Sequence, residues 1–291
     1  MQSIMDLLNS GKILLSDGAM GTELQKTLPQ GYCPEELNVS RPDIIKEIHK
    51  CYYAAGSDIV ETNSFGANKA RLKMHGHGKR VREFAMAAAG NARDVCPEGK
   101  FVAGSIGPLG ELLEPFGELS IDDAYLMFAE TAEALQEGGV DILFIETMMA
   151  IEEAETAVRA AKDKTTLPVA ATMTFESGNA GLRTMWGVDV PTAVSRLTDA
   201  GADLIGANCG RGFEDMICIM KEMRALTTKP LLAQANAGMP ELINGKNIYR
   251  ETPEIIAPKV ELLLKSGVNI MGGCCGTGPD HIREMRKLVG E

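Results

Sequence analysis

Eight short apolar runs alternate along this sequence with longer stretches that have helical periodicity, and this alternation limits the folds open to the chain. The runs lie at residues 12–18, 58–64, 101–108, 141–147, 168–175, 203–209, 230–237 and 268–275. Continuous apolar runs of this length are typical of strands buried on both faces. Strands separated by helices form parallel sheets, because each helix returns the chain to the start of the next strand.

The intervening segments carry helix start and stop signals. One predicted helix begins at Arg41 and Pro42, continues through IIKEIHKCYYAAG and stops at a glycine. Proline is favoured in the first turn of a helix. A second covers IDDAYLMFAETAEALQEGG, where apolar residues recur at spacings of three and four before Gly138–Gly139. EEAETAVRAAKD and VPTAVSRLTDAG repeat this pattern.

A short phrase recurs four times, as AGSDIV, GGVDIL, AGADLI and SGVNIM. Each copy joins a helix end, a glycine and the first residues of a buried strand, which indicates a repeated βα unit. Eight such units predict an α/β fold, a single (β/α)8 TIM barrel that forms one domain over residues 1–291. The alternative is a doubly wound open sheet, but SDGAMGTE follows the first run in place of G-x-G-x-x-G.

Charge and cysteine content restrict the partners and the compartment. The 29 basic and 40 acidic side chains give a net charge of 29 − 40 = −11, which disfavours nucleic acid and anionic membranes as partners. No apolar run approaches the roughly 20 residues of a membrane span. The first 18 residues are too polar for a signal peptide. Seven cysteines without a short-spaced framework are typical of free, metal-bound or catalytic thiols, so we expect a cytoplasmic protein.

The predicted strands end in polar residues, although their interiors are apolar. These endings are Asp17, Gly18 and Ala19 after the first run, Glu61 to Ser64 at the second, Glu146 and Thr147 at the fourth, Asn208 and Cys209 at the sixth, Asn236 at the seventh, and Cys274 and Cys275 at the eighth. Functional residues of barrels gather at the carboxyl ends of the strands. Buried polar groups need partners, so these endings predict a binding site.

Three of the cysteines form a candidate metal site. Cys209 and the Cys274–Cys275 pair end strands that are close together in a barrel, and the glycines around the pair free the backbone from the alternation of a regular strand. Three thiolates with one open position suit a catalytic zinc ion and a further thiol ligand. The alternative is that all three are small buried apolar residues, which is what we expect of Cys33, Cys51, Cys96 and Cys218.

Five motifs together resemble the homocysteine S-methyltransferase family, and within it the homocysteine-binding module of cobalamin-dependent methionine synthases. They are SDGAMGTELQ, ETNSFGAN, GANCG, QANAGMP and GGCCGTGPDHI, in that order from residue 16 to residue 282. The resemblance implies a (β/α)8 barrel and a zinc ion held by Cys209, Cys274 and Cys275. It also implies that Asn236 occupies the open metal position when substrate is absent. Otherwise Asn236 is a residue that caps a turn.

The resemblance further implies how homocysteine is held. An ammonium group is recognised by carboxylates, and a carboxylate by N–H and O–H donors. In the family these roles map to Asp17 and Glu146 for the ammonium, and to Gly18, Ala19, Thr62 and Ser64 for the carboxylate. From its position alone, Asp17 is equally a turn residue. Glu146 follows the apolar DILFI and needs a partner, whereas no role is assigned to Glu61.

Three functions follow from these residues. In the first, a separate methyl-corrinoid (cobalamin) protein donates the methyl group to homocysteine, since the chain shows neither a second barrel for folate nor a cobalamin module. In the second, S-methylmethionine or betaine is the donor. In the third, the chain is a zinc- or thiol-binding module without catalysis, for which an amino-acid site beside the metal would be unnecessary.

Four other residues attract attention without supporting a site. His75 and His77 lie in the basic, glycine-rich segment KMHGHGKR, with no further ligand nearby, so a solvated loop is expected. Trp186 lies in the long loop after the fifth run, where it either lines a donor site or packs the loop. His281, in the last predicted helix, has no neighbouring ligand residue.

Overall fold

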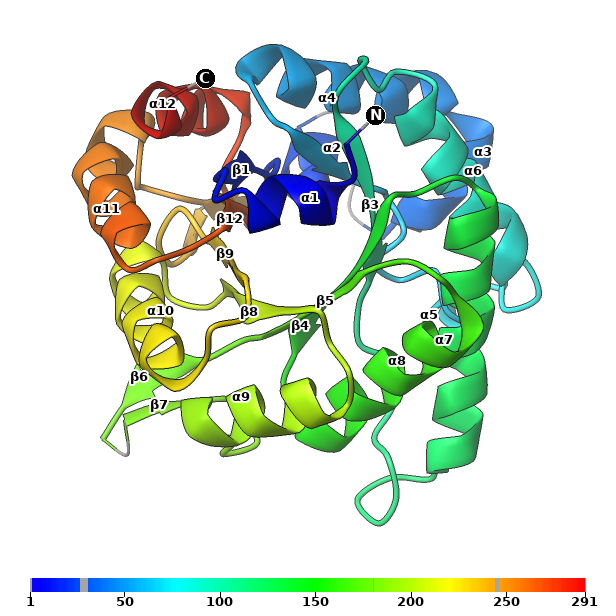
Figure 1. Ribbon diagram of the computed structural model, residues 1–291. Coiled ribbons are helices and arrows are strands. Elements are labelled where there is room, and N and C mark those ends of the chain that lie inside the picture. The colour runs from blue at the N-terminus through cyan, green and yellow to red at the C-terminus, as the bar shows by residue number, and fades with distance from the viewer. Residues whose placement is uncertain (1, 27–30, 180, 244–245, 291) are drawn as a thin grey trace.

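The computed structural model describes residues 2–26, 31–179, 181–243 and 246–290, and its centre is one sheet of eight parallel strands (Figure 1). The strands are β1 (Leu14–Leu15), β2 (Ile59–Glu61), β3 (Phe101–Ile106), β4 (Ile142–Met148), β5 (Val169–Met173), β8 (Leu204–Cys209), β9 (Leu231–Ala235) and β12 (Ile270–Gly273). Each coincides with one of the eight predicted strands, and neighbouring strands pair in parallel.

The sheet closes on itself between its first and last strands. Its order is β1-β12-β9-β8-β5-β4-β3-β2, which leaves β1 and β2 at the two edges. The backbone N–H of Asp58, just before β2, donates to the carbonyl of Leu15 in β1 at 2.6 Å. The N–H of Leu15 donates in return to the Asp58 carboxylate at 2.9 Å. The predicted (β/α)8 barrel is confirmed, and the open doubly wound sheet is excluded.

Helices surround the barrel, as the ring of coiled ribbons in Figure 1 shows. They are α1 (Ile4–Asn9), α2 (Met20–Gln25), α3 (Leu37–Ser40), α4 (Pro42–Ala55), α5 (Lys69–Met74), α6 (Val81–Arg93), α7 (Ile121–Glu137), α8 (Ile151–Lys164), α9 (Val190–Asp199), α10 (Phe213–Leu226), α11 (Pro253–Lys265) and α12 (Pro279–Val289), with a 3-10 turn at Pro34–Glu36. None of the helices in the described ranges is long and apolar enough to cross a bilayer.

The predicted helix signals act as expected. Pro42 stands in the first turn of α4, and Gly56 ends that helix with a φ of 110°, a left-handed conformation that favours glycine. At the start of α7, the Ser120 hydroxyl accepts a hydrogen bond from the N–H of Asp123 at 3.0 Å. The helix then ends before Gly138 and Gly139.

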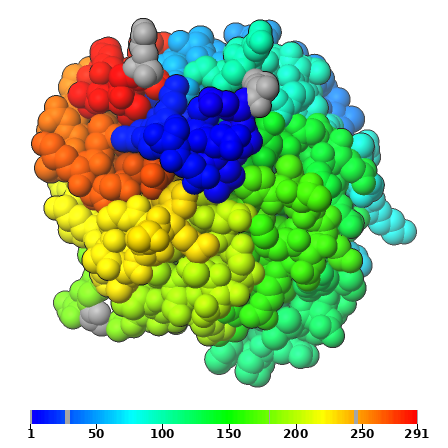
Figure 2. Space-filling view, in the orientation of Figure 1, coloured from blue at the N-terminus to red at the C-terminus, as the bar shows by residue number. Residues whose placement is uncertain are grey.

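Side chains pack in two apolar layers, one between the sheet and the helices and one inside the barrel. The inner layer includes Leu14, Phe144 and Leu204 from the strands, together with Ile4 and Leu8 from α1. Helix α1 therefore closes the amino-terminal end of the barrel, and Figure 2 shows it in blue across the near face. The carboxyl-terminal end of the strands is left for a site.

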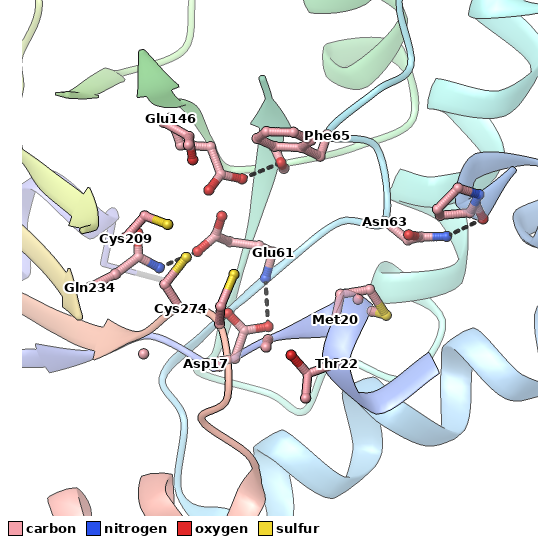
Figure 3. A pocket seen from close by; sticks show the side chains of 18 of the residues that line it. Asp17, Met20, Thr22, Glu61, Asn63, Phe65, Glu146, Cys209, Gln234 and Cys274 are labelled. Carbon is pink, nitrogen blue, oxygen red and sulfur yellow. Dashed lines mark hydrogen bonds between the residues drawn. The ribbon is translucent and has the colours of Figure 1, made fainter. Parts of the chain in front are cut away.

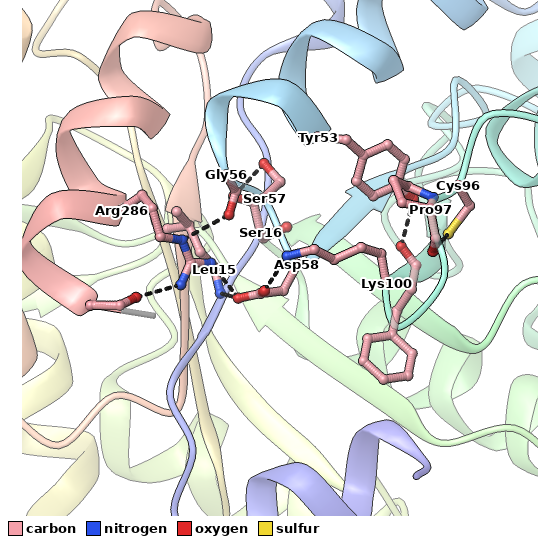
Figure 4. A network of polar contacts seen from close by, with 12 residues as sticks. Leu15, Ser16, Tyr53, Gly56, Ser57, Asp58, Cys96, Pro97, Lys100 and Arg286 are labelled. Carbon is pink, nitrogen blue, oxygen red and sulfur yellow. Dashed lines mark hydrogen bonds and ion pairs between the residues drawn. The ribbon is translucent and has the colours of Figure 1, made fainter. Parts of the chain in front are cut away.

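The recurring sequence phrase corresponds to a recurring contact at the amino-terminal end. The fourth residue of each copy stands just before the second, fourth, sixth or eighth strand of the barrel, and its side-chain oxygen accepts the N–H of a residue in the preceding barrel strand. The four pairs are Asp58 with Leu15, Asp141 with Val102, Asp203 with Val169, and Asn269 with Leu231, at 2.7–2.9 Å. Around Asp58, Lys100 and Arg286 also contribute ion pairs (Figure 4).

Two antiparallel hairpins follow the fifth and seventh barrel strands, at the opposite end. They are formed by β6 (Glu176–Gly178) with β7 (Gly181–Arg183), and by β10 (Glu241–Ile243) with β11 (Lys246–Ile248). The sequence predicts only a long loop after the fifth strand, so both hairpins are additional. Trp186 lies beyond the first hairpin, with its ring 6.0 Å from that of Phe116.

Candidate metal and substrate site

A cavity of about 360 Å³ opens at the carboxyl ends of the strands (Figure 3). Its lining includes four carboxyl groups, from Asp17, Glu35, Glu61 and Glu146, and three thiols, from Cys209, Cys274 and Cys275. Among the described residues that line it there is no lysine, arginine or histidine. A cavity with this lining favours cationic ligands, because no basic side chain in its described lining balances its acidic groups.

The three predicted cysteines converge. Cys209 ends β8, while Cys274 and Cys275 follow β12, and the three sulfur atoms all lie within 4.8 Å of one another. Cys51 and Cys218 are exposed elsewhere on the surface, and Cys33 is buried away from this group. Three sulfurs at this separation form a donor set for a soft or borderline cation such as zinc.

Irregular backbone turns the adjacent cysteines toward the same point. The N–H of Cys274 still donates to Ala235 of β9 at 2.8 Å, but the Cys274 carbonyl then accepts the Thr277 hydroxyl at 2.6 Å. Gly273 permits this turn, since an added Cβ would lie 2.0 Å from the Thr277 hydroxyl oxygen. Cys209 has a φ of 65°, a strained conformation for a residue other than glycine.

Hydrogen bonds among the three thiols shift their pKa values in opposite directions. Hydrogen bonds from Cys274 and Cys275 lower the pKa of Cys209 to about 3. The bond to Cys209 in turn raises the pKa of Cys275 to about 11, and that of Cys274 well above its ordinary value. A divalent cation among the sulfurs would offset the raised pKa values, because metal coordination deprotonates thiols. The residues present therefore fit a zinc ion.

Asn236, which follows β9, lies beside the thiols. Its amide nitrogen donates to the Cys209 sulfur at 3.5 Å and to the carbonyl of Gly210 at 2.6 Å. Its amide oxygen is buried without a hydrogen-bond partner among the described residues. Asn236 therefore contacts one of the three sulfurs through its amide nitrogen and has a free oxygen acceptor, and its place at the metal's open position stays a prediction.

Three carboxyl groups, one buried and two partly buried, form what we call the floor of the cavity; they belong to Asp17, Glu61 and Glu146 (Figure 3). Asp17, after β1, accepts the backbone N–H of Glu61 at 3.0 Å. Glu61, at the end of β2, accepts from the side chain of Gln234. Glu146, in β4, accepts from the Ser105 hydroxyl, and from Asn208 at 3.3 Å. Glu61 and Glu146 both line the cavity, together with Asp17.

Burial governs the ionisation of this floor. It raises the pKa of Asp17 and of Glu61 well above the ordinary carboxyl value, and raises that of Glu146 as well. The charge on Glu146 adds to the effect at both Asp17 and Glu61. All three groups would ionise together only with a positive charge among them.

Comparison with known proteins shows the family to which this chain belongs. The homocysteine S-methyltransferase family profile matches residues 14–289. The chain belongs to the homocysteine S-methyltransferase family. The resemblance seen in its five motifs is thereby confirmed.

Named relatives in this methyltransferase family agree with the assignment. The methionine synthase of Mycobacterium tuberculosis (strain ATCC 25618 / H37Rv) is 33% identical over 98% of this chain, and that of Mycobacterium leprae (strain TN) is 32% identical over 96%. The chain spans only 25% and 24% of these two proteins. The metallated form of the homocysteine methyltransferase MmuM from Escherichia coli shares the fold, with a TM-score of 0.81 at 23% identity over 97% of this chain and 98% of that one.

Of the four residues predicted to hold the substrate's carboxylate, only three line the cavity, and some of their hydrogen-bonding groups already have partners within the protein. Gly18, Ala19 and Thr62 line the cavity, whereas Ser64 does not. The N–H of Ala19 already donates to the carbonyl of Thr277 at 3.0 Å. The Thr62 and Ser64 hydroxyls are 2.6 Å apart, and Ser64 donates to the carbonyl of Ser105 at 2.7 Å. These two hydroxyls therefore fix the β2–β3 edge.

The sequence predicted no individual role for three residues that this site uses, Asn208, Gln234 and Tyr249. Asn208 links Glu146 to the backbone N–H of Thr147, which it accepts at 2.7 Å. Gln234 lies within β9, and Tyr249 lies beyond the β10–β11 hairpin, yet both line the cavity. Asn208 is a polar residue at the end of a predicted strand, so its position in the sequence indicated a place near the site. Nothing in the sequence indicated that Gln234 and Tyr249 would line the cavity.

The residues set aside in the sequence stay outside the cavity. His75, His77 and Trp186 are absent from its lining. The His77 ring packs edge-on against Phe84, with the ring centres 5.4 Å apart. The Trp186 ring lies beside that of Phe116, with the ring centres 6.0 Å apart, and both side chains are exposed.

Proposed function

We propose that this chain is a zinc-dependent enzyme that moves a methyl group to the thiol of homocysteine and so forms methionine. The observation that carries the proposal is the pairing of three convergent thiols with the carboxyl groups of Asp17, Glu61 and Glu146 in one cavity, whose described lining has no basic residue. A metal-storage module would need the thiols alone. An amino-acid thiol needs both, since its sulfur requires the metal and its ammonium requires the acids.

Cys209, Cys274 and Cys275 would hold the zinc ion. When bound, zinc supplies coordination that keeps a substrate thiol in its nucleophilic thiolate form near neutral pH. Asn236 orients Cys209 through its amide nitrogen and is proposed to be a fourth ligand when substrate is absent. Thr277 and Gly273 fix the turn that aims Cys274, so the protein contributes positioning of the attacking sulfur.

Asp17 and Glu146 would bind the ammonium group at the cavity floor. Asn208 and Ser105 hold Glu146 in place by donating to its two carboxylate oxygens. The carboxylate of homocysteine would lie toward Gly18, Ala19 and Thr62, with Ser64 supporting Thr62 from behind. Because the described lining has no cationic side chain, we propose that backbone N–H and neutral polar groups recognise this carboxylate.

The proposed methyl donor is a methyl-corrinoid carried by a separate protein. Two features support it: the similarity to methionine synthases, and a rim of exposed apolar side chains, such as Phe116, Trp186 and Leu242, on loops after the barrel strands. A small donor, S-methylmethionine or betaine, is the second candidate.

We also propose that residues 1–291 act as one homocysteine-binding barrel domain in the cytoplasm. A reducing compartment would suit three thiols that must remain free to bind metal, and all seven cysteines are free. The net charge of −11 supports the expectation of small-molecule and protein partners, with neither nucleic acid nor anionic membrane among them.

A donor screen tests the function. Zinc-loaded protein is mixed with homocysteine and, in separate reactions, with a methylated corrinoid protein, methylcobalamin, S-methylmethionine or betaine, and methionine is quantified. We expect zinc-dependent methionine formation with the corrinoid donors. Turnover with S-methylmethionine or betaine alone would replace the donor assignment. Tight zinc binding with no turnover from any donor would favour the non-catalytic module.

A further inference from the structure

The cavity floor has an excess of hydrogen-bond acceptors that Asp17 and Glu146 alone do not account for. Glu61 is partly buried and lines the cavity with Glu146, and its carboxylate accepts from the Gln234 amide nitrogen. Gln234 is 2% exposed, and its amide oxygen has no partner among the described residues. The N–H group of the Gln234 amide is thus used by Glu61, while its oxygen has no hydrogen bond. A buried oxygen of this kind needs an N–H or O–H group, which a bound ligand could supply.

The other acceptors on the floor are incompletely used as well. Among the described residues, the second oxygen of Asp17 receives only a long contact of 3.4 Å from the Ser16 hydroxyl, and Gln234 donates to one of the two Glu61 oxygens. Glu61 and Glu146 both line the cavity with Asp17, so their free oxygen atoms are available to a ligand. An ammonium group carries three N–H donors and one positive charge, and so matches this group of acceptors.

We propose that Glu61, oriented by Gln234, is a third carboxyl that binds the substrate's ammonium and makes the site selective for thiols with an α-amino group. This inference rests on the proposed function and adds a specificity-determining residue to it. Gln234 acts as the positioning residue, because its amide fixes the Glu61 carboxylate from β9, across the barrel from β2.

The reverse orientation of the substrate is disfavoured by charge. A carboxylate placed on this floor would meet Asp17, Glu61 and Glu146 with no basic side chain in the described lining to compensate. A thiol without an amino group would likewise leave the Gln234 oxygen unpaired. Unpaired buried polar groups are what allow a site to reject an analogue that lacks one functional group.

Three thiols separate the parts of the substrate. Binding to the zinc-loaded protein is measured by calorimetry for homocysteine, for 4-mercaptobutyrate, which lacks the amino group, and for 3-mercaptopropylamine, which lacks the carboxylate. In Glu61→Gln, we expect homocysteine and 3-mercaptopropylamine to bind about 10-fold or more weakly, because a hydrogen bond to a charged group is lost. Affinity for 4-mercaptobutyrate should stay within about 3-fold of wild type.

Glu153→Gln is the matched control. Glu153 is a buried glutamate that accepts the N–H of Leu109 and does not line the cavity. The Glu153→Gln protein should bind all three thiols with the same affinities as wild type. Gln234→Met, which removes the orienting amide, should reproduce the selective loss of Glu61→Gln, and it keeps the proposal testable if Glu61→Gln fails to fold.

Two results would overturn the inference. One is an unchanged homocysteine affinity in Glu61→Gln and Gln234→Met. The other is an equal loss for all three thiols, which would indicate general damage to the site. A zinc-loaded wild-type protein that binds none of the three thiols would contradict the proposed function itself, and this failure is distinct from the first two.

Discussion

Among single residues, Glu61 links the folding stability of the protein to the binding of the substrate's ammonium group. A buried carboxyl with a raised pKa stabilises the folded chain while it is protonated, and this contribution is lost as the pH rises from the unfolded value near 4.3 through the folded one. The ligand-free protein is therefore least stable at the pH values where the carboxyl floor is most ready to receive an ammonium group.

The first prediction follows from this sign. Glu61→Gln should stabilise the ligand-free, zinc-free protein relative to wild type at pH 8, by about 1–3 kcal/mol, since it removes a buried charge. The gain should shrink toward pH 5, where Glu61 stays protonated. Thermal unfolding of both proteins at the two pH values measures this difference. A gain that does not vary with pH would contradict the assigned ionisation.

Individual site residues differed in how well the sequence could reveal them. Cys209 and Glu146 end apolar strands, so burial of a polar group made them visible. Gln234 is one of several small or polar residues inside its run, and only closure of the barrel decides that it faces the cavity. The engaged N–H of Ala19 depends on the distant residue Thr277, which no local pattern relates to it.

At the level of elements, the turn after β12 decides whether two adjacent cysteines serve one metal. Gly273→Ala would force a Cβ into the Thr277 side chain, which lies 2.0 Å from that position. We expect the variant to fold but to bind zinc at least about 10-fold more weakly, because the turn must shift. A competition titration with a chelator measures the affinity.

Gly90→Ala in α6 is the control for this turn, since an added Cβ there meets nothing within 4 Å. It should leave zinc affinity unchanged and stabilise the helix by about 0.5–1 kcal/mol. If Gly273→Ala bound zinc as tightly as Gly90→Ala, the turn would not position the cysteines as described.

The segment after the β10–β11 hairpin forms a strap over the metal site, from Tyr249 to Glu251. Tyr249 lies against Gly276, and burial raises the pKa of its hydroxyl, with Cys275 adding to the effect. His281 ties this strap to the metal turn: one ring nitrogen contacts the Glu251 carbonyl at 2.8 Å, and the other accepts the Gly278 N–H at 3.2 Å.

His281→Ala should therefore loosen the strap without removing a metal ligand. We expect zinc loss to a chelator to be several-fold faster, whereas the number of zinc ions bound per chain stays the same. His75→Ala, in the distant α5–α6 segment, should lose zinc at the wild-type rate. Equal rates in the two variants would remove the strap from the account.

Helices and barrel strands were predictable as elements, but the hairpins were not. The barrel strands bury both faces, so their apolar runs are continuous, and α4 carries a proline at its start and a glycine at its end. In β6 and β10 all residues are exposed. Their sequences therefore lack the alternation of apolar and polar residues that would predict a strand. These short pairs depend on packing around the mouth of the barrel.

Across the whole molecule, the two ends of the barrel have different tasks. At the amino-terminal end, Asp58, Asp141, Asp203 and Asn269 satisfy strand N–H groups and α1 closes the core. At the carboxyl-terminal end the strands stop in thiols and acids. The fourfold phrase in the sequence predicted the repeated unit, although the contact that it encodes emerges only when neighbouring strands are placed side by side.

This division gives a prediction for Asp203, which accepts the Val169 N–H at 2.8 Å and pairs with Lys162 at 2.9 Å. Asp203→Ala should cost about 1–3 kcal/mol of stability, because the N–H loses its acceptor. Asp203→Asn keeps an acceptor, as Asn269 does naturally, and should cost less than about 1 kcal/mol. Denaturant unfolding measures both, and zinc affinity should be unchanged in each. Weaker zinc binding would contradict the separation of the two ends.

The zinc content of the purified chain tests the central claim most directly. Metal analysis after zinc loading and dialysis should find one zinc ion per chain in wild type and in Cys218→Ser, whose cysteine is exposed and lies apart from the site. Cys209→Ser, Cys274→Ser and Cys275→Ser should each retain less than about a tenth of that amount. Wild type without stoichiometric zinc, or full zinc retention in all three site variants, would contradict the account.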